Sequence, residues 1–342
     1  MDIIEGVSKM SHKVKFGVFI GRFQVPMPHA GHRVAIAQAA TQSEHLIILV
    51  GSANACPSIK NPWDVKFRMA AIRSMMHQQG FKNYTVLPLN DYPYTDDQWT
   101  SDVRQTVKSV SGDAPVTLFG YDKDSSTYYL KLFPDWNYRE VQSSVVINAT
   151  EIREQMFNYN SAVIPVTVRE DWEYYTKTEP EQFKNYPYPD TLNFNCGDAL
   201  AVCLGHIVLI KRMRAPGRGC WALPGGFKNN NETFFECALR ELEEETNIKV
   251  PNKVLRGSVV STKLFDSPKR SFGIPRNTLA VHFDIKPNPD GTLPKVRAAD
   301  DAAEVKWVPI DYALNDLILW EDHTAIISSM LNVIPLPAYL TI

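Results

Sequence analysis

Apolar and polar residues follow two different spacings along the first half of the chain. Short apolar runs of strand length are followed by longer stretches with helical spacing. The runs that predict buried strands are 14–20, 46–50, 84–89 and 116–119. The stretches that predict helices are 31–41, 62–79, 97–110, 127–133 and 150–157. Strands that alternate with helices favour a parallel sheet with helices on both faces, and such sheets bind ligands beyond the carboxyl ends of their strands.

The spacing changes after residue 158, where Pro, Tyr, Asn and Glu become dense. This composition predicts a linker with one short helix near 169–177. Beyond it, two apolar runs flank Gly205 and His206, which predicts a hairpin. Helices are expected at 233–246 and 322–331, and further strands at 253–263, 277–283 and 304–308. Strands outnumber helices in this half, so we expect an α+β domain.

These patterns divide the chain into a flexible arm, two domains and a linker. We expect the arm at 1–13, a doubly wound α/β domain at 14–160, the linker at 161–192 and the α+β domain at 193–342. A chain of 342 residues is long enough for two domains, since domains usually hold roughly 100–200 residues.

Composition and charge exclude several classes of protein. Hydrophobic residues make up 44% of the chain and charged residues 22%, as in ordinary globular proteins. The net charge of −2 lacks the basic excess of a nucleic-acid binder, so we expect no nucleic-acid partner. The five cysteines form no CxxC pair, which favours a reducing, cytoplasmic location. The apolar runs are too short to span a membrane and the first residues do not resemble a signal peptide, so we expect no membrane partner.

The first candidate site follows the first predicted strand. A polar loop leaves this strand through Gly21, Arg22, Phe23 and Gln24. The next helix then opens with a His-x-Gly-His pattern made by His29, Gly31 and His32. Backbone N–H groups at a helix N-terminus bind anions, the two histidines can donate to phosphoryl oxygens, and Gly31 allows close approach of a nucleotide. Taken alone, the pattern is also compatible with a strand-turn-helix that carries incidental histidines.

These residues resemble the HxGH signature of the nucleotidyltransferase superfamily, and most closely the archaeal-type nicotinamide mononucleotide (NMN) adenylyltransferases. The segment 147–153 resembles the superfamily's ISSTxIR-type motif. In this segment Thr150 is expected to cap a helix, and Arg153 to form a forked contact with the leaving phosphates. The resemblance covers roughly residues 14–160 and implies a Rossmann-like fold.

The same resemblance implies the substrates and their contacts. The implied reaction is attack of the NMN phosphate on the α-phosphorus of ATP, which gives NAD and pyrophosphate. His29 and His32 would hold the triphosphate, and Mg²⁺ would bridge it. No general base is needed, because the attacking phosphate is already ionised. Further substrate-binding residues implied by the resemblance, beside those of the loop and the motif, are Asn61, Trp63, Arg68, Trp99, Tyr121 and Asp122.

The second candidate site is a set of carboxylates on the predicted helix 233–246. Glu241, Glu244 and Glu245 are spaced so that they share one helical face. Three carboxylates there repel one another, and a hard divalent cation such as Mg²⁺ would relieve the repulsion. Arg240 and Glu232 are expected to form an ion pair that holds the preceding loop on the helix. A solvated acidic face is the alternative for a run of glutamates without this fixed spacing.

The run from Gly226 to Glu245 closely resembles the Nudix box. Asn247 stands where the family has glycine, and Asn tolerates the left-handed conformation expected there. The loop with Arg270 and Arg276 resembles that of Nudix ADP-ribose pyrophosphatases, which implies that both arginines bind substrate. The resemblance covers about residues 190–335 and implies metal-assisted hydrolysis of ADP-ribose to AMP and ribose 5-phosphate. Glu244 and Glu245 are the catalytic candidates, and the general base is either a box glutamate or an outlying acid.

The two resemblances together predict a multifunctional enzyme of NAD metabolism, with Mg²⁺ at both sites and Mn²⁺ as the alternative ion. ATP, NMN, NAD and ADP-ribose are its expected ligands. One alternative is an adenylyltransferase with a Nudix domain that only senses ADP-ribose, although all box carboxylates are present. Another is a different mononucleotide substrate, such as the nicotinate form. A homo-oligomer also stays open.

Overall fold

The computed structural model describes residues 12–121, 125–142, 149–187, 192–299 and 302–341. Contacts between Cα atoms divide the chain into two compact units. Unit 1 comprises Met1–Ala53, Val65–Leu89 and Asp97–Arg153. Unit 2 comprises Asn54–Asp64, Asn90–Asp96 and Glu154–Ile342. No helix among the described residues is long and apolar enough to cross a membrane.

In the described part of unit 1, five parallel strands form one sheet in the order β3-β2-β1-β4-β5. The strands are β1 (Val14–Gly21), β2 (Ser43–Val50), β3 (Tyr84–Pro88), β4 (Val116–Gly120) and β5 (Asn137–Glu140). The helical elements are α1 (Ala30–Thr41), α2 (Val65–Gln78), α3 (Asp96–Ser111) and the 3₁₀ helix η1 (Ser125–Lys131), and the first half of α4 (Ala149–Asn158), up to Arg153, also belongs to this unit. Sequence analysis missed the short strand β5, which is mostly exposed and polar. The doubly wound parallel sheet confirms the predicted fold class.

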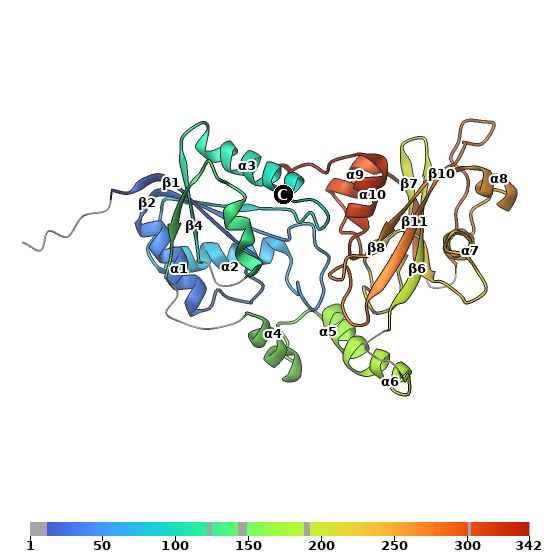
Figure 1. Ribbon diagram of the computed structural model, residues 1–342, viewed down its shortest axis with the longest axis horizontal. Helices are drawn as coiled ribbons and strands as arrows, with labels where there is room; N and C mark the ends of the chain where they lie inside the picture. Colours follow the sequence, from blue (N-terminus) through green and yellow to red (C-terminus); the bar gives the residue numbers. More distant parts are fainter. Residues whose placement is uncertain (1–11, 122–124, 143–148, 188–191, 300–301, 342) are drawn as a thin grey trace, which may run out of the picture. The chain divides into compact units, whose positions relative to one another are not determined.

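Alternate residues of the buried strands explain why helices cover both faces of this sheet. Leu46 and Ile48 of β2 pack with α1 and α2 in one apolar cluster. Ile47 and Leu49 point to the other face and pack with α3 in a second cluster. Figure 1 shows this layered arrangement of helices around β1, β2 and β4. Because β1 pairs with both β2 and β4, the chain order reverses beside it, and the loop after Gly21 lies where such sheets bind ligands.

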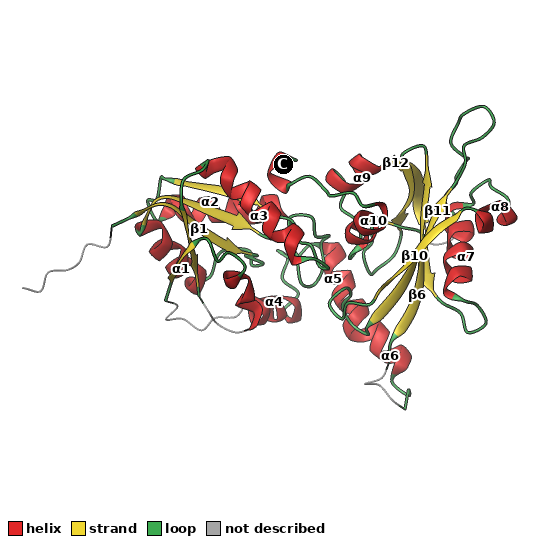
Figure 2. Ribbon diagram, turned by 45° about the horizontal axis from the view of Figure 1, so that its top comes forward, coloured by secondary structure: helices red, strands yellow, loops and turns green. Residues whose placement is uncertain are grey.

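Unit 2 contains a mixed sheet, in which seven strands are described. Its central order is β10-β11-β6-β7-β12, with β8 paired to β7 and β9 paired to β6. The strands are β6 (Phe194–Cys203), β7 (His206–Arg212), β8 (Trp221–Ala222), β9 (Gly225–Phe227), β10 (Val259–Phe265), β11 (Arg276–Asp284) and β12 (Ala302–Pro309). Strands β6 and β11 are parallel, whereas the other pairs are antiparallel. Figure 2 separates these strands from the helices by colour and shows the α+β arrangement that the sequence predicts.

Four helices of unit 2 pack on the two faces of this sheet, namely α7 (Phe234–Thr246), α8 (Asn252–Gly257), α9 (Ile310–Asn315) and α10 (His323–Leu331). The 3₁₀ helix η4 (Ala338–Leu340) follows them in the chain. Ala199 and Ala201 of β6 pack with α7, whereas Leu200 packs with α9 and α10. The hairpin across Gly205 forms as predicted.

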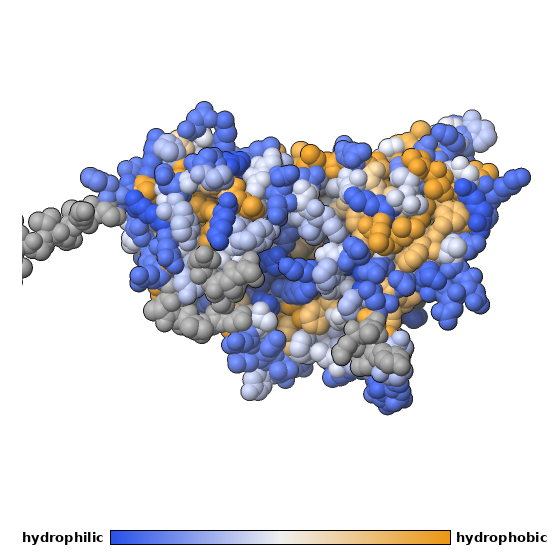
Figure 3. Space-filling view, viewed as in Figure 1, coloured by the Kyte–Doolittle hydropathy of each residue, from blue (hydrophilic) through white to orange (hydrophobic). Residues whose placement is uncertain are grey.

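The strand expected at 253–263 is partly wrong. Residues Asn252–Gly257 form α8 instead, and β10 begins only at Val259. Pro251 begins this helix, because its carbonyl accepts hydrogen bonds from the N–H groups of Val254 and Leu255. These local bonds override the alternation of apolar and polar residues. Strand β10 lies at the sheet edge, and Figure 3 shows apolar side chains gathered over this part of unit 2.

The expected linker 161–192 holds three described helical elements. They are α5 (Val166–Glu173), the π-helix η2 (Tyr174–Thr178) and α6 (Glu179–Phe183). Val168, Tyr175 and Glu179 are buried, and Glu179 forms an ion pair with Arg276 of β11. The segment therefore packs as part of unit 2, and it contributes side chains to the site described below.

Candidate functional sites

The loop after β1 turns sharply and buries its aromatic residue. Phe23 adopts a left-handed backbone conformation with φ 52° and is buried. A side chain at Gly21 would press on the ring of Phe23, with its Cβ 2.7 Å from Cζ. The same ring meets His32 edge-on, with 5.1 Å between ring centroids. The buried ring of Phe23 therefore packs against His32, while Arg22 stays exposed.

The two histidines of the His-x-Gly-His pattern stack at the start of α1. His29 is the N-cap residue, and its Nδ1 accepts a hydrogen bond of 3.4 Å from the His32 backbone N–H. The ring centroids are 3.8 Å apart. Burial and the neighbouring His29 lower the pKa of His32 to about 3, so His32 is neutral at physiological pH. Gly31 between them is buried.

Gln24 carries an unusual pair of buried polar atoms. Its side chain is 3% exposed, and neither its Nε2 nor its Oε1 has a hydrogen-bond partner among the described residues. The buried Nδ1 of His32 also lacks a partner there. A buried polar atom without a partner costs roughly 1–3 kcal/mol, which a bound ligand with matching donors and acceptors would recover. The loop after β1 thus presents buried polar atoms that can bind a polar ligand.

The ISSTxIR-like segment reaches the same loop. Arg153 donates from Nη1 to the carbonyl of Gln24 at 3.1 Å and from Nη2 to Thr150 Oγ1 at 3.1 Å. Thr150 lies in the first turn of α4, which begins at Ala149, and not at the cap position before the helix. The structure therefore brings Arg153 beside the loop of Gln24, and its forked contact with the leaving phosphates stays a prediction.

Arg68 is placed inside the fold of unit 1. Its side chain is 1% exposed and donates to the carbonyls of Arg22, Gly51 and Ser52 at 2.7, 2.6 and 2.9 Å. It joins the loops after β1 and β2, and this contact supports the shape of the site. Its direct contact with an anion stays a prediction.

The remaining expected contacts for the mononucleotide are placed in both units. Trp99 is half-buried and packs edge-on against Tyr129 with 5.8 Å between centroids, and Tyr121 is exposed. Asp122 lies outside the described residues. Asn61 and Trp63 belong to unit 2, where the Trp63 indole N–H donates to the Val163 carbonyl at 3.1 Å. Their role in substrate binding stays a prediction.

Helix α7 in unit 2 begins and ends as the sequence predicts. Thr233 caps its N-terminus, and Glu236 completes a capping box with the Thr233 backbone. Asn247 ends the helix in the left-handed conformation with φ 44°. The helix therefore starts and stops at fixed residues, which fixes the direction of its acidic side chains.

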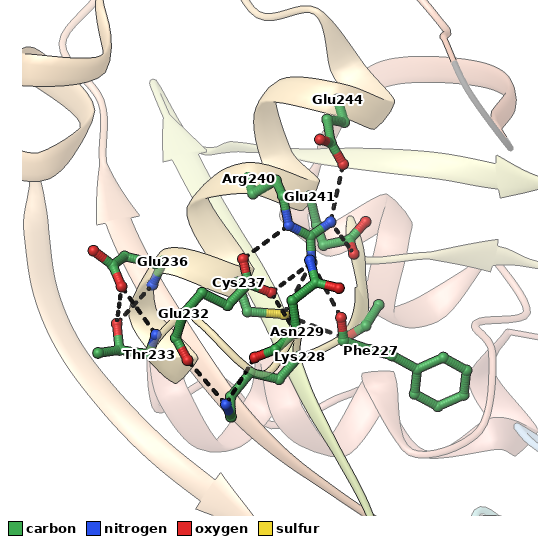
Figure 4. A network of polar contacts seen from close by, with 11 residues as sticks. Phe227, Lys228, Asn229, Glu232, Thr233, Glu236, Cys237, Arg240, Glu241 and Glu244 are labelled. Carbon is green, nitrogen blue, oxygen red and sulfur yellow. Dashed lines mark hydrogen bonds and ion pairs between the residues drawn. The ribbon is translucent and has the colours of Figure 1, made fainter.

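Arg240 is the centre of an ionic network on α7, shown in Figure 4. It forms a forked ion pair with Glu232, with Nε and Nη2 at 2.9 and 2.7 Å from the carboxylate. Its Nη1 also contacts Glu241 at 2.7 Å and Glu244 at 2.9 Å. The predicted Arg240–Glu232 pair is confirmed, and Arg240 lowers the pKa of Glu232 to about 2. The preceding loop is thereby held against the helix.

Glu245 points away from this network. It is buried and accepts a hydrogen bond from the Gly225 backbone N–H at 3.0 Å. Burial and the nearby Glu241 raise the pKa of Glu245 to about 8, and burial also raises the pKa of Glu241. Added side chains at Gly225 or Gly226 would collide with the carboxylates of Asp198 and Glu241. Acidic oxygens thus crowd against the glycine turn of β9.

The donor chemistry of this region fits a hard divalent cation. Mg²⁺ and Mn²⁺ prefer oxygen ligands. The negative charges of Glu241 and Asp198 both act on the buried carboxyl of Glu245. In the described residues no three acidic, histidine or cysteine side chains stand ready as a metal-binding group. Instead Arg240 supplies the positive charge beside Glu241 and Glu244, while Glu245 bonds to the backbone.

The two arginines expected to bind substrate are both buried in ion pairs. Arg270 contacts both oxygens of Asp322, at 3.0 and 2.9 Å, and Tyr94 donates to the same carboxylate at 2.5 Å. Arg276 pairs with Glu179 and stacks over the rings of aromatic neighbours. Their contact with substrate stays a prediction.

A pocket of about 410 Å³ lies beside the Nudix-like turn. It is lined by Tyr174, Gln182, Phe183, Asn193, Phe194, Asn195, Phe227, Lys228 and Asn230. Phe227 directly follows Gly226, and the Lys228 ammonium donates to the carbonyl of Glu232 at 2.9 Å. The pocket combines flat aromatic walls with amide groups, which is the chemistry that holds a heterocyclic base.

Sequence analysis missed Asp198 and this aromatic pocket. Asp198 stands at the start of an apolar run and gives no signal by itself. Phe194 and Phe227 meet because Cys196 of β6 pairs with Phe227 of β9, and Phe183 comes from the expected linker. Only the strand register and the helical packing of α6 bring these residues together.

Comparisons with known proteins match both units. The cytidylyltransferase-like family model matches residues 18–155, and the NUDIX domain model matches residues 198–329. The chain is 36% identical over 148 residues to a nicotinamide/nicotinic acid mononucleotide adenylyltransferase of Acinetobacter baylyi, which covers 43% of this chain and 77% of that protein. It is 35% identical over 128 residues to an ADP-ribose pyrophosphatase of Methanocaldococcus jannaschii, which covers 37% of this chain and 66% of that protein.

The match to a solved structure extends over nearly the full length. That structure is of a bifunctional NMN adenylyltransferase/ADP ribose pyrophosphatase of Francisella tularensis, complexed with AMP and a manganese ion. The TM-score is 0.81 with 30% sequence identity, and the match covers 93% of this chain and 99% of that chain.

Proposed function

This chain belongs to the family of bifunctional NMN adenylyltransferase/ADP-ribose pyrophosphatases, and we propose that it carries out both reactions. In the first, AMP is transferred from ATP to NMN, which gives NAD and pyrophosphate. In the second, ADP-ribose is hydrolysed to AMP and ribose 5-phosphate. The observation that carries the first activity is the group of buried polar atoms of Gln24 and His32, beside Arg153, for which the described part of the chain offers no hydrogen-bond partner.

The adenylyltransferase site works by positioning and by hydrogen bonding to phosphate. His32 is neutral, so one ring nitrogen donates to a phosphoryl oxygen while the ring stays stacked on His29. The amide of Gln24 offers a donor and an acceptor at the carboxyl end of β1. Arg153 carries a fixed positive charge to the leaving pyrophosphate. The attacking NMN phosphate is already ionised, so these residues hold and orient the reactants without removing a proton.

The Nudix site holds a diphosphate beside a group of carboxylates on α7. Glu241, Glu244 and Glu245 are the residues we propose as ligands of Mg²⁺, with Mn²⁺ as the alternative ion. The cation supplies charge neutralisation and an activated water when bound. Arg240 keeps Glu241 and Glu244 close together, and the Gly225 N–H orients Glu245. Asp198, the buried acid beside Gly225, joins Glu245 as a candidate for the general base.

We assign the adenine of ADP-ribose to the pocket of Phe183, Phe194 and Phe227. The aromatic rings can stack on a purine, and the amides of Asn193 and Asn195 can bond its edge. Because Phe227 directly follows Gly226, a base in this pocket places the diphosphate near the carboxylates of α7. A Phe194→Ala variant is expected to raise KM for ADP-ribose and to leave NAD synthesis unchanged.

Product analysis of the full-length protein with Mg²⁺ tests both activities. One reaction holds ATP and NMN, and the other holds ADP-ribose. We expect NAD in the first and AMP in the second. NAD without AMP would show that the Nudix unit does not hydrolyse ADP-ribose and would favour a binding role. AMP without NAD would refute the proposed adenylyltransferase activity. Nicotinate mononucleotide in a third reaction measures the preference between the two mononucleotides.

Two substitutions test the independence of the sites. Glu244→Gln should abolish hydrolysis of ADP-ribose and leave NAD synthesis intact, because it alters only a carboxylate of α7. His32→Ala should have the opposite effect, because it removes a phosphate donor of unit 1. Loss of both activities in either folded variant would contradict two independent sites.

A further inference from the structure

Two of the five cysteines of the chain meet inside unit 2. Cys56 lies in the segment Asn54–Asp64, and Cys220 directly precedes β8. The two thiols lie close enough for each to shift the pKa of the other. Both side chains also belong to one apolar cluster, together with Ala222 and Trp320. Neither reaction proposed above uses these thiols, yet the fold holds them in contact across a long stretch of sequence.

The surroundings of the two thiols differ. Cys56 is 5% exposed. The neighbouring Cys220 thiol and burial raise the pKa of Cys56. Cys220 is half-buried, and the neighbouring Cys56 thiol lowers the pKa of Cys220, aided by the positive charge of Arg212 and opposed by burial and Asp171. Because the thiolate is the reactive form, Cys220 is the accessible nucleophile and Cys56 is its protected neighbour.

The other cysteines lack this reactivity. Burial raises the pKa of Cys196 and of Cys237 to about 12, and burial also raises the pKa of Cys203. Their thiolate fractions at neutral pH are therefore small, and a mild oxidant should leave them reduced. They serve as internal controls for any reaction of the pair.

We propose that Cys56 and Cys220 form a redox-active pair that closes to a disulfide with low-molecular-weight disulfides such as glutathione disulfide. The thiolate of Cys220 first attacks one sulfur of the small disulfide, and the released thiolate takes up a proton. Cys56 then gives its proton to solvent and attacks the sulfur of Cys220, which releases the second small thiol. The protein thiols lose two protons and two electrons in total, and the small disulfide gains both to become two thiols.

The resulting bond connects two segments that matter for the rest of the molecule. The segment Asn54–Asp64 contains Asn61 and Trp63, which the sequence resemblance links to the mononucleotide. Cys220 precedes the strand and turn that lead to Gly225 and the acidic helix.

Peptide mapping of the full-length protein tests the pair. The reduced protein is incubated with glutathione disulfide, alkylated in denaturant and digested without reduction, and its peptides are identified by mass spectrometry. We expect one linked pair of peptides, Cys56 with Cys220, while the other cysteines are alkylated. A dithiol should restore both thiols. If Cys56 and Cys220 are alkylated as in the untreated protein, or if glutathione stays on Cys220, the proposal is wrong.

Single variants test the order of the two steps. Cys56→Ala should trap glutathione on Cys220, because the second thiol is missing. Cys220→Ala should leave Cys56 unmodified, because Cys56 is buried. Cys203→Ser is the matched control and should still form the linked pair. Glutathione on Cys56 in a folded Cys220→Ala protein would overturn the assigned roles, and circular dichroism verifies the fold of each variant.

Discussion

Replacing Arg240 with glutamine removes the positive charge on which the acidic groups of α7 and its preceding loop converge. The guanidinium forms a forked pair with Glu232 and single contacts with Glu241 and Glu244. It also donates to the carbonyl of Phe227 at 3.1 Å. Glutamine keeps a polar side chain of moderate length but cannot neutralise any of these carboxylates. The variant therefore leaves three negative charges close together.

The expected loss of stability follows from the exposure of each partner. Removing one member of a buried ion pair costs roughly 3–5 kcal/mol, whereas exposed pairs contribute about 0–1 kcal/mol. The Arg240 side chain is 26% exposed and that of Glu232 is 12% exposed, so their pair lies nearer the buried case. The Glu244 side chain is 49% exposed and adds little. We expect Arg240→Gln to lower the free energy of unfolding by about 3 kcal/mol.

Urea unfolding of the full-length protein measures this loss, first with EDTA and then with Mg²⁺. A divalent cation bound to Glu241 and Glu244 replaces part of the missing charge, so the loss should be at least about 1 kcal/mol smaller with Mg²⁺. Arg218→Gln breaks the exposed Arg218–Glu170 pair and is the matched control, with a much smaller loss that Mg²⁺ does not change. An unchanged stability in EDTA, or an equal loss with and without Mg²⁺, would refute this reasoning.

Two further predictions concern unit 2. Burial raises the pKa of Asp171 to about 6, so the folded protein favours the protonated carboxyl. The stabilisation that this protonated carboxyl gives is lost as the pH rises through 6. Asp171→Asn keeps the hydrogen bond from the Gly217 N–H. In urea unfolding it should raise the free energy of unfolding by roughly 2–3 kcal/mol at pH 8 and leave it unchanged at pH 4. An equal gain at both pH values would contradict this. Asn247 has φ 44°, a left-handed conformation that leucine adopts only with strain. Asn247→Leu should therefore lower the free energy of unfolding by about 1 kcal/mol, whereas Asn247→Gly should not. Equal melting temperatures for these two variants would exclude the conformational explanation.

The parts of the molecule that local spacing determines were predictable from the sequence. The buried strands β1, β2 and β4 are apolar runs, because both faces of a parallel sheet are covered. Helix α7 begins after Thr233 and ends at Asn247, as capping chemistry requires. The Arg240–Glu232 pair also follows from residue spacing, because the loop returns to the helix that it precedes.

The parts that depend on contacts distant in sequence were not predictable. Asp198 approaches the acidic helix only because β6 pairs with β9, opposite Gly225. The aromatic pocket needs Phe183 from a segment whose Pro and Asn content indicates a linker. The burial of Arg276 likewise depends on Glu179 of α6. In each case the residue type is ordinary, and only the folded arrangement gives it a place in the site.

The two sites differ in the charges that they present to the phosphate groups they are proposed to bind. Both are proposed to bind phosphate groups in a chain whose net charge is −2, so neither can depend on a general positive field. Unit 1 uses neutral donors, since burial keeps His32 uncharged and Gln24 presents an amide, with Arg153 as the fixed cation. Unit 2 instead concentrates carboxylates that repel phosphate until a cation neutralises them. Hydrolysis should therefore depend on the divalent ion for binding of the diphosphate itself, whereas in unit 1 the side chains of His32, Gln24 and Arg153 are proposed to hold the phosphate oxygens directly.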